Sequence, residues 1–279
     1  MRKFLIGLLA AIILVASISP SLARHLKGMN CDAFDKFVET PNSQADRFGA
    51  FVKKLELVRK RNTEIYFVGI AFHSDVYFEN EIDLIECRIV SRFGNDVRSV
   101  KLSYSSRDQY LYPTASMIRK VTKAIGEVSN KKTDLIVVYI TSHGARNKII
   151  TKHDDIGGYI WDFDLAAMFD SLSHHKAIFF IQSCYSGSLI DQFENPRRVI
   201  ITASAAENKS FGCGGFRFTH FGSALAKGLL RNNSSLNDVF VALKMGVEEL
   251  EQSNFESSNP QMWIGRDMSS FATAPFVAQ

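Results

Sequence analysis

The chain has 279 residues, of which 46% are hydrophobic, so it can bury a substantial core as one large α/β domain or two small ones. Its formal net charge is only +4, and it has no dense basic tract with interleaved aromatic residues, which excludes a nucleic-acid partner on charge grounds. Four cysteines without a CxxC pair exclude a disulfide scaffold and a zinc module, although they leave room for one disulfide with undefined partners.

The first residues have the layout of a secretory signal peptide. Arg2 and Lys3 are basic, an apolar run from Phe4 to Ile18 follows, and Ser21 and Ala23 put small residues where a signal peptidase reads. The apolar run is shorter than the roughly 20 residues of a membrane span. We therefore expect cleavage after about Ala23 and an exported chain, periplasmic or secreted, without membrane attachment. An uncleaved membrane anchor is the alternative.

The signal peptide, residues 1–23, is followed by a charged segment. We interpret residues 24–62, which Pro41 interrupts, as an N-terminal extension that tolerates helix but whose structure the sequence does not define. No internal repeat or low-complexity stretch divides residues 63–279, so we predict one domain there. The sequence does not define its oligomeric state.

Strands and helices alternate along that domain. Short apolar runs predict buried strands, and apolar side chains at every third or fourth position predict helices. In chain order we expect a strand at 65–71, a helix at 78–93, a strand at 97–104, a helix from just after Pro113 to Val128, a strand at 135–140, a short helix at 165–172 capped by Asp162 or Asp164, strands at 177–182 and 199–203, helices at about 220–231 and 236–252, and a short strand at 262–264. This alternation predicts an α/β fold, a three-layer αβα sandwich with a mostly parallel sheet.

Two of the predicted strands end in residues that can carry chemistry. The strand at 135–140 leads into Thr141, Ser142, His143 and Gly144, and the strand at 177–182 leads into Ser183 and Cys184. Ligands of parallel sheets gather beyond the carboxyl ends of the strands. If these strands are parallel neighbours, an imidazole and a thiol lie at one edge of the sheet.

An imidazole beside a thiol suits nucleophilic catalysis. An ordinary cysteine has a pKa of about 8.5, so little thiolate exists at neutral pH unless a neighbouring base takes the proton. His143 can take that proton and later return it to the leaving amine, while Cys184 attacks an acyl carbon. The backbone amides of Gly144 and Cys184 are the candidate donors to the oxyanion that develops.

Structural interpretations compete with this one. A free cysteine after a buried strand is more often a core residue than a nucleophile, and the pattern alone leaves the two interpretations about even. The pairs His153-Asp154 and His174-His175 lack the spacing of metal ligands, so we predict neither a metal site nor a cofactor. Arg146 is interpreted as part of a solvated loop.

Five segments, in this order, carry a resemblance to a known family: FVGIA, YITSHGA, IQSCYSG, VIITASAAENKSFGCGG with THFG, and SNPQMWIG. Together they resemble the legumain family of cysteine peptidases, most closely its bacterial branch, within the caspase-like clan. The similarity extends from about Phe67 to Gly265. It implies a caspase-like fold and a Cys-His dyad peptidase that acts on polypeptides without a cofactor.

The resemblance also implies a role for individual residues. His143 matches the general base, Cys184 the nucleophile and Gly144 an oxyanion-hole amide, and Ser210 falls near the substrate-specificity pocket. The chain departs from the eukaryotic members because residues 71–75 lack the asparagine that orients the histidine there. Tyr185 likewise replaces their acidic residue. A catalytically inactive caspase-like domain that binds protein or peptide is therefore the alternative to a peptidase.

Overall fold

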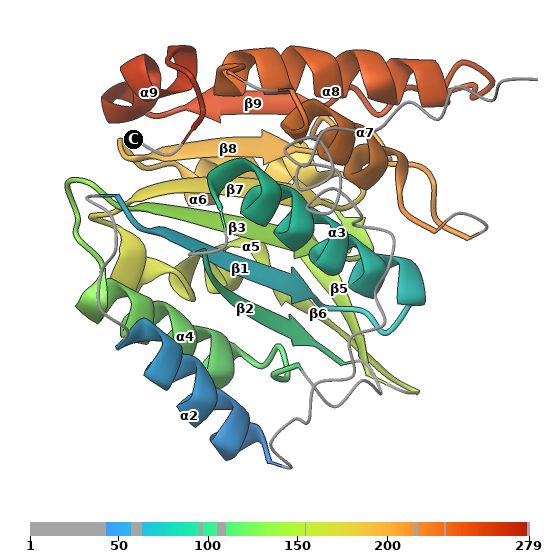
Figure 1. Cartoon of the computed structure of the whole chain (residues 1–279). Coiled ribbons are helices and arrows are strands. Elements are labelled where there is room, and N and C mark those ends of the chain that lie inside the picture. The colour runs from blue at the N-terminus through green and yellow to red at the C-terminus, as the bar shows by residue number, and fades with distance from the viewer. Residues whose placement is uncertain are drawn as a thin grey trace, which may run out of the picture. The chain divides into compact units, whose positions relative to one another are not determined.

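A six-stranded sheet organises the residues that the computed structural model describes, which are 43–56, 63–94, 97–104, 110–153, 155–214, 217–231 and 233–277. Its strands lie in the order β2-β1-β3-β7-β8-β9 (Figure 1). The strands are β1 Ile65–Ala71, β2 Arg98–Ser103, β3 Leu135–Thr141, β7 Lys176–Gln182, β8 Arg198–Thr202 and β9 Gln261–Ile264. The first five pair in parallel and β9 runs antiparallel to β8.

Helices cover both faces of the sheet. One face carries α3 Val76–Phe93, α7 His220–Leu229 and α8 Leu236–Leu250, and the other carries α2 Gln44–Leu55, α4 Ala115–Val128 and α5 Asp162–Ala167 (Figure 1). Shorter helical segments are the 3₁₀ turns Asp170–Leu172, Ser186–Leu189 and Arg266–Met268 and the helices α6 Ile190–Phe193 and α9 Ser269–Thr273.

The strands are apolar throughout because both sides of each are buried. Val137 and Tyr139 of β3 pack into the layer under α3, whereas Val138 and Ile140 pack into the layer under α4. This alternation is the normal consequence of the two-residue period of a strand. The predicted three-layer α/β sandwich with a mostly parallel sheet is confirmed.

The short helix predicted at 165–172 differs from the observed one. Helix α5 begins at Asp162 and ends at Ala167, and a separate 3₁₀ turn covers Asp170–Leu172. Trp161 occupies the N-cap position, so the prediction that Asp162 or Asp164 is the cap was wrong. Both carboxylates instead lie in the first turn of α5, where they face the positive end of the helix dipole.

A second, smaller sheet was absent from the sequence prediction. Strands β4 Gly144–Ala145, β5 Lys148–His153 and β6 Ile156–Trp161 form an antiparallel sheet in a segment interpreted as a loop. Most of β6 is exposed, so its sequence lacks the apolar alternation of a half-buried strand. The turn between β4 and β5 places Asn147 at φ 60°, a left-handed conformation that asparagine tolerates.

Helix α2 falls within the segment predicted to be an N-terminal extension. Its Ser43 N-cap accepts a hydrogen bond from the amide of Asp46, and its Phe51 and Leu55 are buried in the core layer that contains α4. The predicted signal peptide lies outside the described residues. Within the described residues, no helix combines the length and apolarity that crossing a membrane requires.

Candidate active site

The two predicted catalytic segments lie side by side. Strands β3 and β7 are parallel neighbours whose last pair is Thr141 with Gln182, and the amide of Ser142 donates to the carbonyl of Gln182 over 3.0 Å. His143 and Cys184 therefore leave the sheet at the same edge. A Cβ added to Gly144 would lie only 2.5 Å from the Cys184 carbonyl oxygen, so the two loops touch and glycine is required at this contact.

A tight turn follows Cys184. Tyr185 has φ 58°, a left-handed conformation that is unfavourable for an aromatic residue, and its amide donates to the carbonyl of Asn208 over 2.8 Å. Gly187 lets the backbone pack closely, because a Cβ there would lie 2.5 Å from the amide nitrogen of Ala206. Backbone strain of this kind concentrates at functional sites, where the surroundings enforce it.

The sulfur of Cys184 is half-buried and contacts Ser210. Its thiol donates to the Ser210 carbonyl over 3.4 Å, and the Ser210 amide donates to the sulfur over 3.4 Å. Among the described residues, no hydrogen bond joins Cys184 to His143. Hydrogen bonds between catalytic groups are often long without substrate. Ser210, predicted near the specificity pocket, thus lies directly against Cys184.

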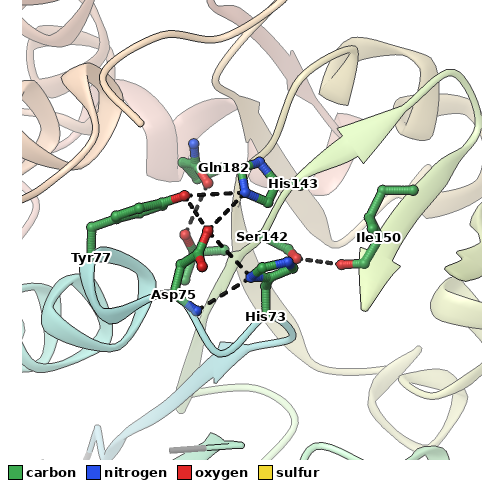
Figure 2. A network of polar contacts seen from close by, with 8 residues as sticks. His73, Asp75, Tyr77, Ser142, His143, Ile150 and Gln182 are labelled. Carbon is green, nitrogen blue, oxygen red and sulfur yellow. Dashed lines mark hydrogen bonds and ion pairs between the residues drawn. The ribbon is translucent and has the colours of Figure 1, made fainter. Parts of the chain in front are cut away.

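The imidazole of His143 is held by residues that follow β1. Its Nε2 lies 3.0 Å from Oδ2 of Asp75 and 3.1 Å from the hydroxyl of Tyr77, which itself donates to Asp75 Oδ2 (Figure 2). A carboxylate can only accept, so the short contact assigns the proton of a neutral His143 to Nε2. Its Nδ1 is then the nitrogen left to accept a proton from a thiol.

The protonation states of Asp75 and Tyr77 support this assignment. Burial raises the pKa of Asp75, but hydrogen bonds from Tyr77 and His143 outweigh it, and the net pKa lies below the usual value. Burial and the hydrogen bond to Asp75 raise the pKa of Tyr77 well above its usual value. At neutral pH a charged carboxylate therefore accepts from a protonated phenol and from the imidazole.

A second histidine completes this corner of the site. His73 is 8% exposed, and its Nδ1 accepts a hydrogen bond from the Asp75 amide over 3.3 Å. Its ring meets the ring of His143 edge to face at 4.7 Å between centroids, and Phe78 meets His143 in the same way at 5.1 Å. Burial lowers the pKa of His73, so it is neutral at pH 7. These contacts fix the plane of the His143 ring.

Asp75, Tyr77 and His73 were missed as site residues from the sequence. In residues 71–75 the sequence showed only the absence of the asparagine found in the eukaryotic members. A usable signal existed, because His73 and Asp75 follow a buried strand, and the neighbouring strand β3 delivers His143 to the same sheet edge. The geometry shows that Asp75 makes the contact for which an asparagine was expected.

Two backbone amides are available to a developing oxyanion. In an antiparallel sheet, hydrogen-bonded residue pairs alternate with pairs that are not hydrogen-bonded. The Ile150 amide donates to the His143 carbonyl, so His143 and Ile150 are a hydrogen-bonded pair. The next pair, Gly144 with Ile149, is therefore not hydrogen-bonded. The Gly144 amide therefore points away from β5. The Cys184 amide donates to no other residue within the described parts of the chain.

Cys213 is the other free cysteine of the described residues, and like Cys184 it is partly buried. Burial, together with the negative charges of Glu81 and Cys184, raises the pKa of the Cys213 thiol to about 12. It packs against the core layer that contains α3. Cys213 is thus a protonated, unreactive thiol at physiological pH.

Comparison with known proteins places the site in context. The model of the Peptidase C13 family matches residues 97–270, well over half of the chain. Metacaspase-6 of Arabidopsis thaliana is 27% identical over 125 residues, which cover 40% of this chain and 34% of that protein. Legumain of Mus musculus is 25% identical over 128 residues, which cover 43% of this chain and 29% of that protein. The chain thus spans about a third of the length of these relatives.

A solved structure shares the fold. Caspase-1 from Spodoptera frugiperda superposes with a TM-score of 0.51 at 14% identity, over 76% of this chain and 89% of that one. At this identity the similarity concerns the fold, and it confirms the expectation of a caspase-like architecture.

Proposed function

The chain belongs to the Peptidase C13 family of cysteine-type peptidases, and from this membership and the geometry of its site we propose that it cleaves peptide bonds through a thioester on Cys184. One observation carries the proposal. Neighbouring parallel strands bring His143 and Cys184 to one sheet edge, and Asp75 holds the imidazole with Nδ1 free. Its substrates are polypeptides, as the family implies.

The proposed reaction uses the residues of this corner in sequence. Nδ1 of His143 takes the thiol proton, and the thiolate attacks the carbonyl carbon of the scissile bond. The amides of Gly144 and Cys184 donate to the resulting oxyanion. His143 then returns the proton to the departing amine, which leaves an acyl thioester on Cys184, and water hydrolyses that thioester with His143 as base. Asp75 stabilises the imidazolium in both steps.

A substrate digest tests this proposal. We expect the purified chain to cleave members of a proteome-derived peptide library and Cys184→Ala to lose the cleavage. Cys213→Ala, which removes the partly buried thiol of raised pKa, serves as the matched control and should retain it. The same digest reports the residue preferred before the cleaved bond. Cleavage by Cys184→Ala at the wild-type rate would rule out the mechanism.

The alternative is a catalytically inactive domain that binds peptides. The lack of the expected asparagine favoured it, but Asp75 contacts His143 in that place. Peptides that bind the wild-type chain and remain intact would support this alternative.

We further propose that the chain is exported after removal of residues 1–23. The charge and apolar pattern of that segment supports the proposal, as does Cys87, which is disulfide-bonded, because such bonds persist in oxidising compartments. Sequencing the N-terminus of the mature protein tests it. An N-terminus near residue 24 is expected, whereas intact residues 1–23 on a membrane fraction would indicate an anchored form.

A further inference from the structure

The corner behind His143 has the composition of a transition-metal site. His73, Asp75 and His143 each offer one ligand atom, and these three atoms lie within 4.8 Å of one another. Both imidazoles face the carboxylate of Asp75 (Figure 2). We propose that this corner binds Zn²⁺ and that the bound ion inhibits the peptidase. The inhibitory part rests on the proposed function, whereas the binding part does not.

The donor atoms and their spacing suit zinc. Two imidazole nitrogens and one carboxylate oxygen form a common zinc ligand set, with bonds of about 2.0–2.2 Å. Tetrahedral bonds of that length separate ligand atoms by roughly 3.3 Å. In the structure, Asp75 Oδ2 lies 3.0 Å from His143 Nε2 and 3.4 Å from His73 Nδ1. The hydrogen bonds of His73 Nδ1 with the Asp75 amide and of His143 Nε2 with the Tyr77 hydroxyl have to give way to the ion.

The surroundings hold the ligands in place and leave a route for the ion. His73 Nδ1 accepts from the Asp75 amide, so it carries a lone pair and no proton. A zinc ion would take that lone pair and replace this hydrogen bond. Tyr77 donates to Asp75 Oδ2, the kind of outer contact that orients a ligating carboxylate. The side chains of Asp75 and His143 are each 36% exposed, so solvent reaches the corner.

A metal ion here would prevent catalysis by a defined route. Without zinc, the proton of neutral His143 is on Nε2. Zinc on Nε2 therefore requires the other tautomer, in which the ring proton resides on Nδ1. Nδ1 can no longer accept the proton of Cys184. Asp75, engaged with the ion, is also lost as the partner of the imidazolium. The ion is therefore a reversible inhibitor and has no part in the reaction.

Zinc binding can be measured apart from catalysis. We would titrate ZnCl₂ into Cys184→Ala protein by calorimetry, which removes the thiolate as a ligand and requires no activity. We expect one ion bound with a Kd below about 100 μM, and no binding of MgCl₂, since Mg²⁺ prefers oxygen ligands. His73→Asn in that background should weaken binding at least about tenfold, because even the loss of an outer-shell partner costs that much. His174→Asn, at an exposed histidine, is the matched control and should bind normally.

The outcomes separate the two proposals. Unchanged zinc binding in the His73→Asn variant, or no binding by Cys184→Ala protein, would overturn the site. If His73→Asn does not fold, anomalous scattering at the zinc edge from ZnCl₂-soaked crystals of Cys184→Ala protein decides, and it should place the ion between the three side chains.

His73-dependent binding by a chain without peptidase activity would uphold the site and refute the proposed function. In an active chain, ZnCl₂ should inhibit cleavage near the Kd measured by calorimetry. Full activity with the site saturated would overturn the inhibitory role.

Discussion

At the scale of single residues, Asp75 sets the orientation and the tautomer of the His143 imidazole. Its carboxylate accepts from His143 Nε2 over 3.0 Å and from Tyr77, and it stays ionised at neutral pH because these hydrogen bonds outweigh its burial. Asp75 touches neither the nucleophile nor the scissile bond in the proposed reaction. It is a positioning residue that fixes one tautomer of the imidazole and stabilises its charged form.

Replacing that carboxylate with an amide should impair turnover. In Asp75→Asn the side chain keeps its size but loses its charge, so the imidazolium is no longer stabilised. General acid–base catalysis contributes about 10²- to 10⁴-fold, and we expect kcat to fall by about 10²-fold with KM unchanged. Steady-state kinetics on one peptide substrate provide the measurement. A rise in KM at constant kcat would show that Asp75 binds substrate and does not position His143.

From the sequence, His143 and Cys184 were predicted as a catalytic pair, but the residues around them were not predicted. A strand followed by His-Gly and a strand followed by Cys are local patterns that can be read directly. The contact between Asp75 and His143 joins residues 68 positions apart, and it depends on which strand lies beside β3. The left-handed conformation of Tyr185 could not be predicted from the sequence either. A glycine would have indicated it, but here the residue is a tyrosine whose amide is held by the Asn208 carbonyl.

At the scale of elements, strand β7 ends two residues before Cys184 and anchors that segment in the core. Its Phe179 is fully buried and meets Phe169 and Phe193 at ring-centroid distances of 5.1 and 5.2 Å. The guanidinium of Arg198 lies over the same ring at 5.0 Å. Phe179 thus links β7 to the helical layer on one face of the sheet.

Truncating this ring should cost much of the stability. Phe-to-Ala substitutions in cores lose about 3–5 kcal/mol through lost transfer energy and a residual cavity, so we expect Phe179→Ala to fall in that range. Denaturant unfolding followed by circular dichroism measures the loss. Phe255→Ala provides the matched control, because Phe255 is fully exposed, and it should change stability by less than about 0.5 kcal/mol. A similar small loss for Phe179→Ala would contradict this packing.

Long, buried elements were predictable from sequence and short, exposed ones were not. Continuous apolar runs in the sequence indicate four of the strands, β1, β3, β7 and β8. The runs are continuous because helices cover both faces of these strands. The sheet of β4, β5 and β6 packs only partly, and its Gly157 and Gly158 look like loop residues. It nevertheless supports the site, since the Ile150 amide holds the carbonyl of His143.

At the scale of the whole molecule, buried histidines link stability to pH. Burial lowers the pKa of His73, His175 and His220 below the usual value. The unfolded chain therefore binds protons more readily than the folded chain at these positions. Stability is fully present above pH 6.5 or so, and it is lost as the pH falls through the lowered pKa values.

His175 allows one of these contributions to be isolated. It is 2% exposed and precedes the first residue of β7, whereas Cys184 follows the last, so His175→Leu removes one buried titrating group away from the catalytic pair of the proposal. On going from about pH 7.5 to about pH 5.5, the melting temperature of the wild type should fall further than that of His175→Leu, because only the wild type has to keep this ring neutral. Groups such as Glu81, whose pKa burial raises, affect both proteins alike. An equal pH dependence in the two would contradict this assignment.

If His143 activates Cys184 as proposed, the sulfur of Cys184 should be unusually reactive toward alkylating reagents. The measurement is the rate of alkylation by iodoacetamide at about pH 7, followed residue by residue with mass spectrometry. An ordinary thiol, with a pKa of about 8.5, is mostly unreactive there. We expect rapid labelling of Cys184 in the wild type and slow labelling in His143→Ala. Cys213, whose raised pKa of about 12 keeps its thiol protonated, should react little in either protein. Equal rates at Cys184 with and without the imidazole would contradict the proposed activation.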